Sequence, residues 1–239
     1  GMETLAIALN TQGNFAMNAF GSSTATNQAG VSALLSAAYT LDGDADISYE
    51  TTGIITVNRN DKETDDADKQ YLFQGSLSGK TANTTITQNS SVKQDRTGIF
   101  STLGGTASFS NLVIAGTVEN ANGTGGIAYQ AKGTSFTLSE VKVQKAFRSN
   151  TGRIGGVLAQ ENSDAAFVVT AKNVTLASEI TGDASSDFSG FITYMEKVDV
   201  ELDGIVLGGK LQSTLNECGG FLGRYWYWMQ GTIQNVTVQ

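Results

Sequence analysis

The stretch GIFSTLGGTASFSNLVIAGTV (98–118) carries the pattern that decides the fold. It begins with Gly98 before two apolar residues and passes through a glycine-containing turn. It ends in an alternating run followed by a run of β-branched residues. Alternation of apolar and polar residues is typical of a β-strand with one buried face. The stretch therefore predicts short strands separated by tight turns.

The same order of features recurs in 125–144, 155–180, 189–211 and 219–239. The leading glycines are separated by 28, 30, 34 and 30 residues, and they are Gly98, Gly126, Gly156, Gly190 and Gly220. The second strands also align, through Leu112/Ile114, Val141/Val143, Val174/Leu176, Ile205/Leu207 and Val236/Val238. A period of about 30 residues with short strands is the size of one coil of a β-solenoid. The sequence predicts an all-β fold, a parallel β-helix.

Stacking of coils explains which residue types recur. One coil is too small to bury its own apolar face, so neighbouring coils must pair their strands in parallel. We expect an inward ladder formed by Ile99, Ile127, Val157, Phe191 and Phe221. We also expect a repeated turn, where amide side chains bond along the stack, at Asn111, Glu140, Asn173, Gly204 and Asn235. A β-sandwich is the main alternative, but it requires no fixed recurrence.

The N-terminal part has a different pattern. Apolar residues at Val31, Leu34, Leu35 and Ala38 have the spacing of a short amphipathic helix within 27–41. We interpret 1–45 as a cap, with a strand at 4–10 and this helix, and 46–239 as the β-helix, with first-coil strands in 46–60. The last repeat stops without a polar cap, so we expect the natural polypeptide to continue.

The units share the pattern Gly-Gly-φ-φ-Gly/Ala, a short turn, and Gly-Thr-φ-x-Asn-φ-x-φ, where φ is apolar. GGFLGRYWYWMQGTIQNVTV and 98–118 match it best, and the pattern resembles the GLUG-type repeats of bacterial surface proteins. YLFQGSLSGKTANTTITQNSSV (71–92) looks like the coil that precedes such repeats. The resemblance covers 71–239 and implies a right-handed parallel β-helix of the pectin-lyase-like kind, with almost nothing implied about activity. The unit at 155–180 departs from it, because it lacks the Gly-Thr before its second strand.

Composition excludes several function classes. The chain has 239 residues, a net charge of −8, no histidine, no proline and one cysteine. Without histidine, zinc sites and Ser-His-Asp or Cys-His catalysis are not expected, and we predict no catalytic residues, no metal and no cofactor. The negative charge argues against nucleic acid and anionic membranes as partners. A single cysteine allows no internal disulfide, and the longest apolar runs are too short to insert into a membrane.

The candidate binding residues are four consecutive rings, Tyr225, Trp226, Tyr227 and Trp228. In the repeat alignment they lie at the connection between the first and second strands, where we expect them to face solvent. Flat rings pack on the apolar face of a pyranose, so the run is a candidate carbohydrate- or partner-binding surface. The alternative is that the rings only cover the end of the stack.

Other charged residues are weaker candidates for a site. Asp42, Asp44 and Asp46 have the i, i+2, i+4 spacing of a calcium loop, but the sixth and twelfth positions do not fit, and a solvated turn is the simpler interpretation. The acidic run 60–69 is interpreted as a solvated loop. The resemblance implies that a lyase of this fold would use an Arg or Lys base beside carboxylate-bound calcium. The residues of suitable type are Arg148, Arg153, Lys172, Asp164 and Asp183, and no motif links them.

The sequence as a whole predicts a non-catalytic extracellular or cell-surface module of a bacterial protein, acting in adhesion or as a stalk. Its partners would be a glycan or a host or cell-surface protein. No signal peptide is visible, and the leading Gly-Met looks like a cloning remnant. A polysaccharide-binding or polysaccharide-degrading β-helix is the alternative, and it would need converging carboxylates and basic residues from adjacent coils.

Overall fold

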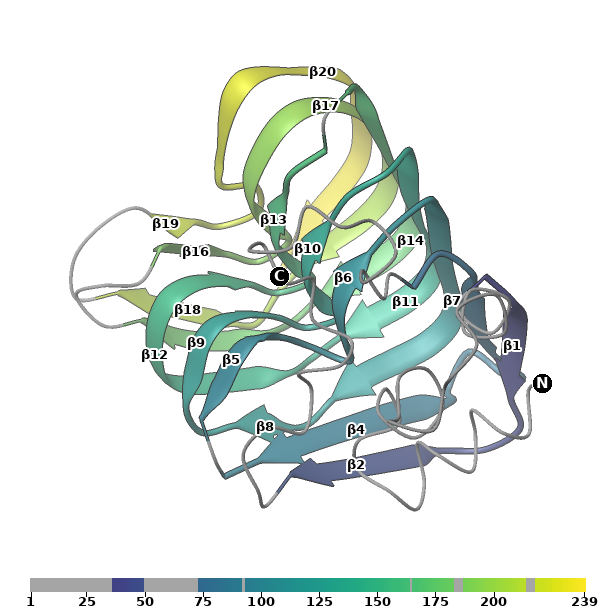
Figure 1. Ribbon diagram of the computed structural model, residues 1–239, viewed down its shortest axis with the longest axis vertical. Helices are drawn as coiled ribbons and strands as arrows, with labels where there is room; N and C mark the ends of the chain where they lie inside the picture. Colours follow the sequence, from purple (N-terminus) through teal and green to yellow (C-terminus); the bar gives the residue numbers. More distant parts are fainter. Residues whose placement is uncertain (1–35, 50–72, 92, 164, 183–186, 214–217) are drawn as a thin grey trace, which may run out of the picture.

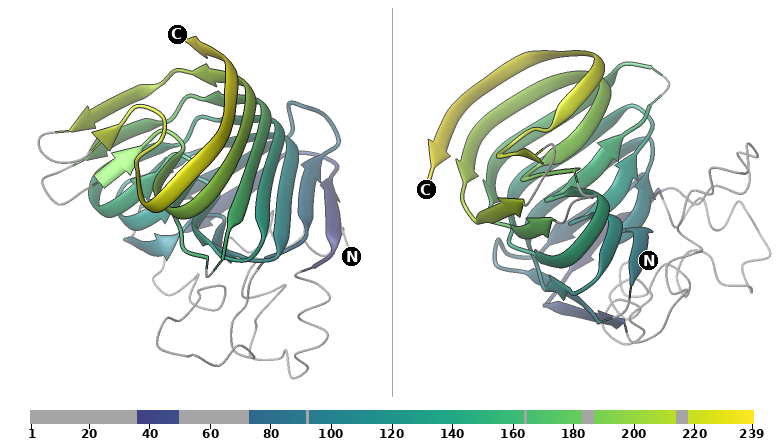
Figure 2. Two further views of the ribbon diagram at one scale, coloured as in Figure 1. Left: turned by 90° about the horizontal axis from the view of Figure 1, so that it is seen from above. Right: turned by 90° about the vertical axis from the view of Figure 1, so that its left-hand side faces the viewer.

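The chain folds into a stack of parallel coils. The computed structural model describes residues 36–49, 73–91, 93–163, 165–182, 187–213 and 218–239. In these residues the structure is all β, with no helix, and it forms a β-solenoid of about 5 turns with coils of roughly 31 residues. Figure 1 and Figure 2 show the coils lying one on another, from β1 to β20. The predicted fold class and period are confirmed.

The strands follow one another coil by coil. The early coils comprise β1 (Ala38–Leu41), β2 (Ala45–Tyr49), β3 (Ser76–Gly79), β4 (Thr85–Ser90) and β5 (Gln94–Thr97). The middle coils comprise β6 (Phe100–Leu103), β7 (Thr106–Ala115), β8 (Thr117–Val118), β9 (Ala121–Gly125), β10 (Ala128–Ala131), β11 (Ser135–Val143) and β12 (Ala146–Gly155). The later coils comprise β13 (Leu158–Glu161), β14 (Phe167–Leu176), β15 (Glu179–Gly182), β16 (Asp187–Ser189), β17 (Ile192–Leu207), β18 (Lys210–Ser213), β19 (Cys218–Gly219) and β20 (Arg224–Val238).

Strand register confirms the alignment of the repeats. Leu112 pairs with Val141, Val141 with Val174, Val174 with Ile205, and Ile205 with Val236, all in parallel strands. Each residue therefore lies beside its counterpart in the next coil. The backbone N–H and C=O groups of the strands form hydrogen bonds to the coils on both sides. Because proline has no N–H to donate, a sequence without proline suits this fold.

The inward ladder is also confirmed. Ile99, Ile127, Val157 and Phe191 are at most 1% exposed, and the partly buried Phe221 packs against the same core. The ring centroids of Phe191 and Phe221 are 5.7 Å apart. Like side chains thus stack on like from coil to coil and remove one another from water.

The repeated turn is a column of left-handed residues. The φ angles are positive at Asn111 (53°), Glu140 (55°), Asn173 (54°), Gly204 (73°) and Asn235 (55°). The amide of Asn173 donates to Glu140 Oε1 at 2.6 Å, and that of Asn235 donates to Asp203 Oδ1 at 2.7 Å. Asparagine and glycine tolerate this conformation best, which explains their recurrence here. The predicted bonding along the column is confirmed between Asn173 and Glu140, whereas Asn235 bonds Asp203, the residue before Gly204.

Replacement of Glu140 by asparagine is expected to stabilise the fold by about 0.5–1 kcal/mol. A left-handed conformation costs an ordinary residue about 1–2 kcal/mol, and asparagine adopts it more readily. The side-chain oxygen of the introduced asparagine can still accept a hydrogen bond from Asn173. Urea denaturation measures the difference, with Glu201→Asn on an exposed strand position as the control. A loss of stability in Glu140→Asn equal to that of the control would contradict the explanation.

The predicted helix over 27–41 is wrong at its C-terminal end. Ala38–Leu41 is strand β1, which pairs in parallel with β3, and its buried residues Tyr39 and Leu41 have period two. Pairing with the next coil overrides the weak helical spacing. The rest of that helix, the strand at 4–10, and the acidic run 60–69 lie outside the described residues. Of the expected strands in 46–60, the structure describes only Asp46–Tyr49, within β2.

A second sheet forms a side lobe of the stack. It contains β5, β9, the end of β12, β16 and β19, paired in parallel. A small apolar cluster separate from the main core fills the lobe, formed by Val118, Ala121, Phe147, Ile154, Ile180 and Phe188. Figure 1 shows this sheet meeting the face of β10, β13 and β17 at an angle. That inner corner positions the candidate site.

Candidate functional site

The aromatic run lies within one long strand. Tyr225 to Trp228 are part of β20 (Arg224–Val238), which is continuous, so the prediction of an inter-strand connection is wrong. The cause is β17, which is itself an unbroken strand and pairs with β20 along most of its length. The short turn seen at Gly104 and Gly105 in an earlier coil has no counterpart here.

A β-bulge interrupts the regular pairing of β20 with β17 within the run of four rings. Met195 pairs with Tyr225 and Lys197 with Trp228, so Trp226 and Tyr227 together oppose a single residue of β17. A bulge re-aims side chains relative to regular alternation. Exposed fractions are 54% for Tyr225, 67% for Trp226 and 57% for Tyr227. Exposure of the run to solvent, as predicted, is confirmed for these three rings.

Two adjoining cavities occupy the inner corner between the two sheets. The first, of about 370 Å³, is lined by Asp187, Phe188, Thr193, Gly219, Leu222, Gly223 and Arg224. The second, of about 340 Å³, is lined by Arg153, Gln160, Asn162, Tyr194, Glu196, Arg224 and Trp226. Because they share Arg224, we treat both together as the corner groove. Of the four predicted rings, Trp226 is the one that lines it.

A ladder of polar side chains leads into the groove from the earlier coils. Thr102, Gln130 and Gln160 are paired neighbours in successive strands, and each is at most 4% exposed. Gln130 Nε2 donates to Thr102 Oγ1 at 3.1 Å, and Gln160 Nε2 donates to Gln130 Oε1 at 3.0 Å. In the next two coils the same column holds Tyr194 and Arg224. The buried ladder thus ends at the wall of the groove.

Arg153 is fixed by three partners. Its Nη1 donates to Gln160 Oε1 at 2.8 Å and its Nε to Asp187 Oδ2 at 3.1 Å. Its guanidinium carbon lies 4.4 Å from the centroid of the Tyr194 ring, within the range of a cation–π contact. Desolvation, together with the nearby Glu196 charge, raises the pKa of Tyr194, so its hydroxyl is protonated at neutral pH. This part of the groove is held in one arrangement.

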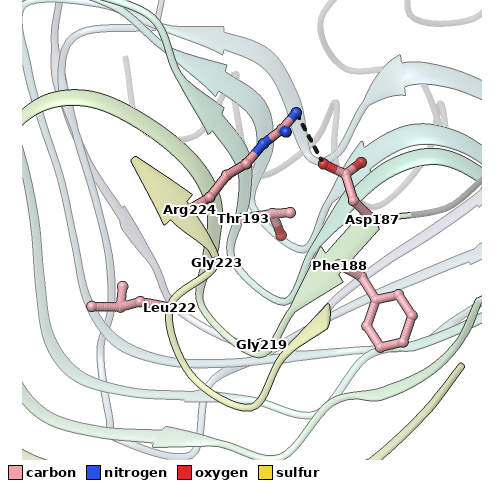
Figure 3. A pocket seen from close by; sticks show the side chains of 7 residues that line it. All are labelled: Asp187, Phe188, Thr193, Gly219, Leu222, Gly223 and Arg224. Atoms are coloured by element: carbon pink, nitrogen blue, oxygen red, sulfur yellow. Dashed lines mark ion pairs between the residues drawn. The ribbon is translucent and has the colours of Figure 1, made fainter. Parts of the chain in front are cut away.

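Arg224 faces the same carboxylate from the other side. Its Nη2 lies 3.9 Å from Asp187 Oδ2, and its guanidinium carbon is 5.5 Å from the Tyr194 centroid. Figure 3 shows Arg224 from β20 and Asp187 from β16 reaching toward one another, with Thr193 close by. Asp187 therefore serves two guanidiniums that come from coils on either side of it.

A buried carboxylate supports the backbone beside the groove. Glu161 is fully buried, and its two oxygens accept from Ser163 N at 2.7 Å and Glu196 N at 2.8 Å. Desolvation raises the pKa of Glu161, while these backbone hydrogen bonds oppose the rise. The contact ties the segment after β13 to β17 and fixes the position of Glu196.

The other charged candidates are not gathered into one site. Asp42 pairs with Lys80 at 3.1 Å, and Asp44 Oδ1 accepts from Thr85 N at 2.9 Å. Arg148 pairs with Glu119 at 3.2 Å, and the exposed Lys172 is on β14. Asp164 and Asp183 lie outside the described residues. Within the described ranges, no group of three or more His, Cys, Asp or Glu side chains could hold a metal ion.

Most groove residues are not marked by the sequence pattern. Arg153 is a candidate there as a basic residue and Trp226 as a binding ring, whereas Gln160, Asp187 and Tyr194 are not singled out. Gln160 and Tyr194 pair in one column, which becomes visible only when the first strands are aligned as the second strands were. Asp187 belongs to the second sheet, where it pairs with Arg153. No helix long and apolar enough to cross a membrane is found among the residues described. Comparison with known protein families, curated proteins and solved structures finds no match.

Proposed function

We propose that this chain is a non-catalytic recognition module of a bacterial cell-surface protein, which acts in adhesion. The corner groove is the observation that carries the proposal. It is a concave site in which guanidinium, carboxylate and amide groups converge beside aromatic rings. Convergent polar groups of this kind fix the orientation of a ligand in a binding pocket. The stacked coils provide a rigid support that also suits a stalk. The partner is a glycan or a surface protein outside the bacterium.

The arrangement of Arg153 favours binding over lyase chemistry. In a lyase of this architecture an arginine or lysine would take a proton from the substrate. Here two N–H groups of the Arg153 guanidinium donate to Asp187 and Gln160, and the Tyr194 ring lies against the guanidinium. These contacts suit a residue that positions its neighbours. Catalysis of polysaccharide cleavage remains the alternative function.

A glycan array and a cell-adhesion assay test the proposal. We expect the wild-type protein, coupled to fluorescent beads, to bind a subset of glycans or intact cells, and Trp226→Ala to reduce binding at least tenfold. Tyr227→Ala is the matched control, because Tyr227 is exposed to a similar degree as Trp226 but lines neither cavity. The centroid of its ring lies 4.8 Å from Lys197 Nζ. We expect this control to bind as the wild type does.

Two results would remove the proposal. The first is an absence of binding to any glycan or cell, which removes the recognition function. The second is equal loss of binding in both variants, which removes the corner groove as the binding site. Release of unsaturated, ultraviolet-absorbing products from uronate polymers would establish the lyase alternative. Antibody labelling of intact bacteria that express the full-length protein tests surface exposure, which labelling only after lysis would contradict.

A further inference from the structure

We infer that the corner groove binds a neutral saccharide, with one sugar face on the Trp226 indole and adjacent hydroxyls on the Asp187–Arg224 pair. The inference rests on the recognition function proposed above and names its ligand class. It follows from the charge balance of the groove, its hydrogen-bonding groups, the placement of Trp226 and the size of the two cavities.

The groove is electrically balanced. It contains two cations, Arg153 and Arg224, and two anions, Asp187 and Glu196, so its formal charge is 2 − 2 = 0. The whole chain carries −8. An acidic polymer would approach against that field and would meet two carboxylates, whereas a cation would meet two guanidiniums. An uncharged ligand meets neither penalty.

A polyhydroxyl ligand matches the groups in the groove. A hydroxyl both donates and accepts, a carboxylate only accepts, and a guanidinium only donates. Two neighbouring hydroxyls can therefore bond Asp187 and Arg224 together, through charge-assisted hydrogen bonds. Because Arg153 already holds Asp187 in place, little side-chain entropy is lost when the ligand binds.

Trp226 supplies the apolar contact that a sugar ring needs. Tyr194, the other ring of the groove, already has the guanidiniums of Arg153 and Arg224 at 4.4 and 5.5 Å from its centroid. Trp226 is 67% exposed and lies at the rim of the second cavity. An indole face packs on the C–H groups of a pyranose while the ring hydroxyls point to polar partners.

The two cavities suit consecutive sugar units. Each has a volume near the lower end of the range of about 300–1,000 Å³ that ligand pockets occupy. They adjoin at Arg224, so a chain that enters one cavity passes this side chain to reach the other. The groove therefore fits a short stretch of oligosaccharide better than a single large group.

Matched pairs of oligosaccharides test the inference. Isothermal titration compares oligosaccharides of glucose, galactose and mannose with uronate oligomers of equal length, which differ by oxidation at C6. We expect at least one neutral member to bind tenfold or more tightly than its uronate counterpart. Its Kd should change less than twofold between about 0.05 and 0.5 M salt, where screening of exposed charges changes strongly.

Two variants tie binding to the groove. Asp187→Asn should weaken neutral-sugar binding at least tenfold, whereas Glu201→Gln, on an exposed position of β17 outside the groove, removes the same charge and should leave the Kd unchanged. Trp226→Ala gives a second loss at an exposed residue, so a fold defect in Asp187→Asn does not decide the outcome. Preference for uronates, or for a protein ligand, overturns the inference and leaves the recognition function standing. No binding to any glycan or cell removes both.

Discussion

Substitution of Gly156 by alanine is expected to lower the free energy of unfolding by about 3 kcal/mol or more. A Cβ on Gly156 would lie 2.0 Å from the carbonyl oxygen of Gly190 and 2.7 Å from its carbonyl carbon. These are backbone atoms, so no side-chain rotation relieves the overlap. Overpacking of a core side chain costs about 1–3 kcal/mol, and a clash with paired backbone lies at or above the top of that range.

The clash falls where successive coils are joined. Gly156 N donates to Ser189 O at 2.9 Å, and the next residue, Val157, donates to Phe191 O at 3.0 Å. To admit a methyl group the two coils would have to separate at these bonds. That separation also pulls apart the inward ladder, because Val157 and Phe191 are its members.

Gly220 provides a matched control in the same column. It follows Gly190 by one coil, and a Cβ there meets nothing within 4 Å. Gly220→Ala is expected to change stability by no more than about 0.5 kcal/mol, as exposed substitutions usually do. Urea denaturation of both variants gives the comparison. Similar losses in the two proteins would show that conformational preference, and not contact between coils, makes the column glycine.

The glycine column also shows what was predictable from the sequence. Recurrence of Gly126, Gly156 and Gly190 at intervals of 30 and 34 residues required only that like positions stack. Parallel pairing then follows because each coil must bury its face on the next. The inward ladder and the left-handed Asn column follow from the same translation. Local periodicity in the chain is thus converted directly into neighbours in space.

The side lobe and the corner groove were not predictable in the same way. The groove depends on an angle between two sheets, and residues such as Arg153 and Tyr194 meet across that angle from different strands. Periodicity gives the neighbours along a column, but not the neighbours across a corner. The same reason applies to Trp226, whose direction is set by a bulge that one extra residue in β20 creates.

Substitution of Lys145 by methionine is expected to flatten the dependence of stability on pH between 7 and 9. Lys145 lies between β11 and β12 and is fully buried. Its Nζ donates to Gln88 Oε1 and to the carbonyl oxygen of Gly126, the latter at 3.1 Å, and it lies 5.9 Å from the Phe147 ring centroid. All three partners are neutral, and burial lowers the pKa of Lys145 to about 7 from an ordinary value of 10.5.

The direction of this pH dependence follows from how many protons the folded and unfolded chains bind. Between pH 7 and 10.5 the unfolded chain holds a proton on Lys145 that the folded chain has released, so stability rises with pH across this window. For these two pKa values the rise between pH 7 and pH 9 is about 2 kcal/mol. Below pH 7 both states hold the proton, and the full penalty of burying the charge applies.

The measurement is the free energy of unfolding in urea at several pH values, for the wild type, Lys145→Met and Lys142→Met. Lys142 is an exposed lysine on β11, so its variant removes the same charge and should keep the wild-type slope. From pH 7 to pH 9 the free energy of unfolding of the wild type should rise by about 2 kcal/mol relative to that of Lys145→Met. Parallel profiles for all three proteins would mean that the Lys145 amine stays charged in the core. In that case its contacts with Gln88 and Gly126 would compensate for burial.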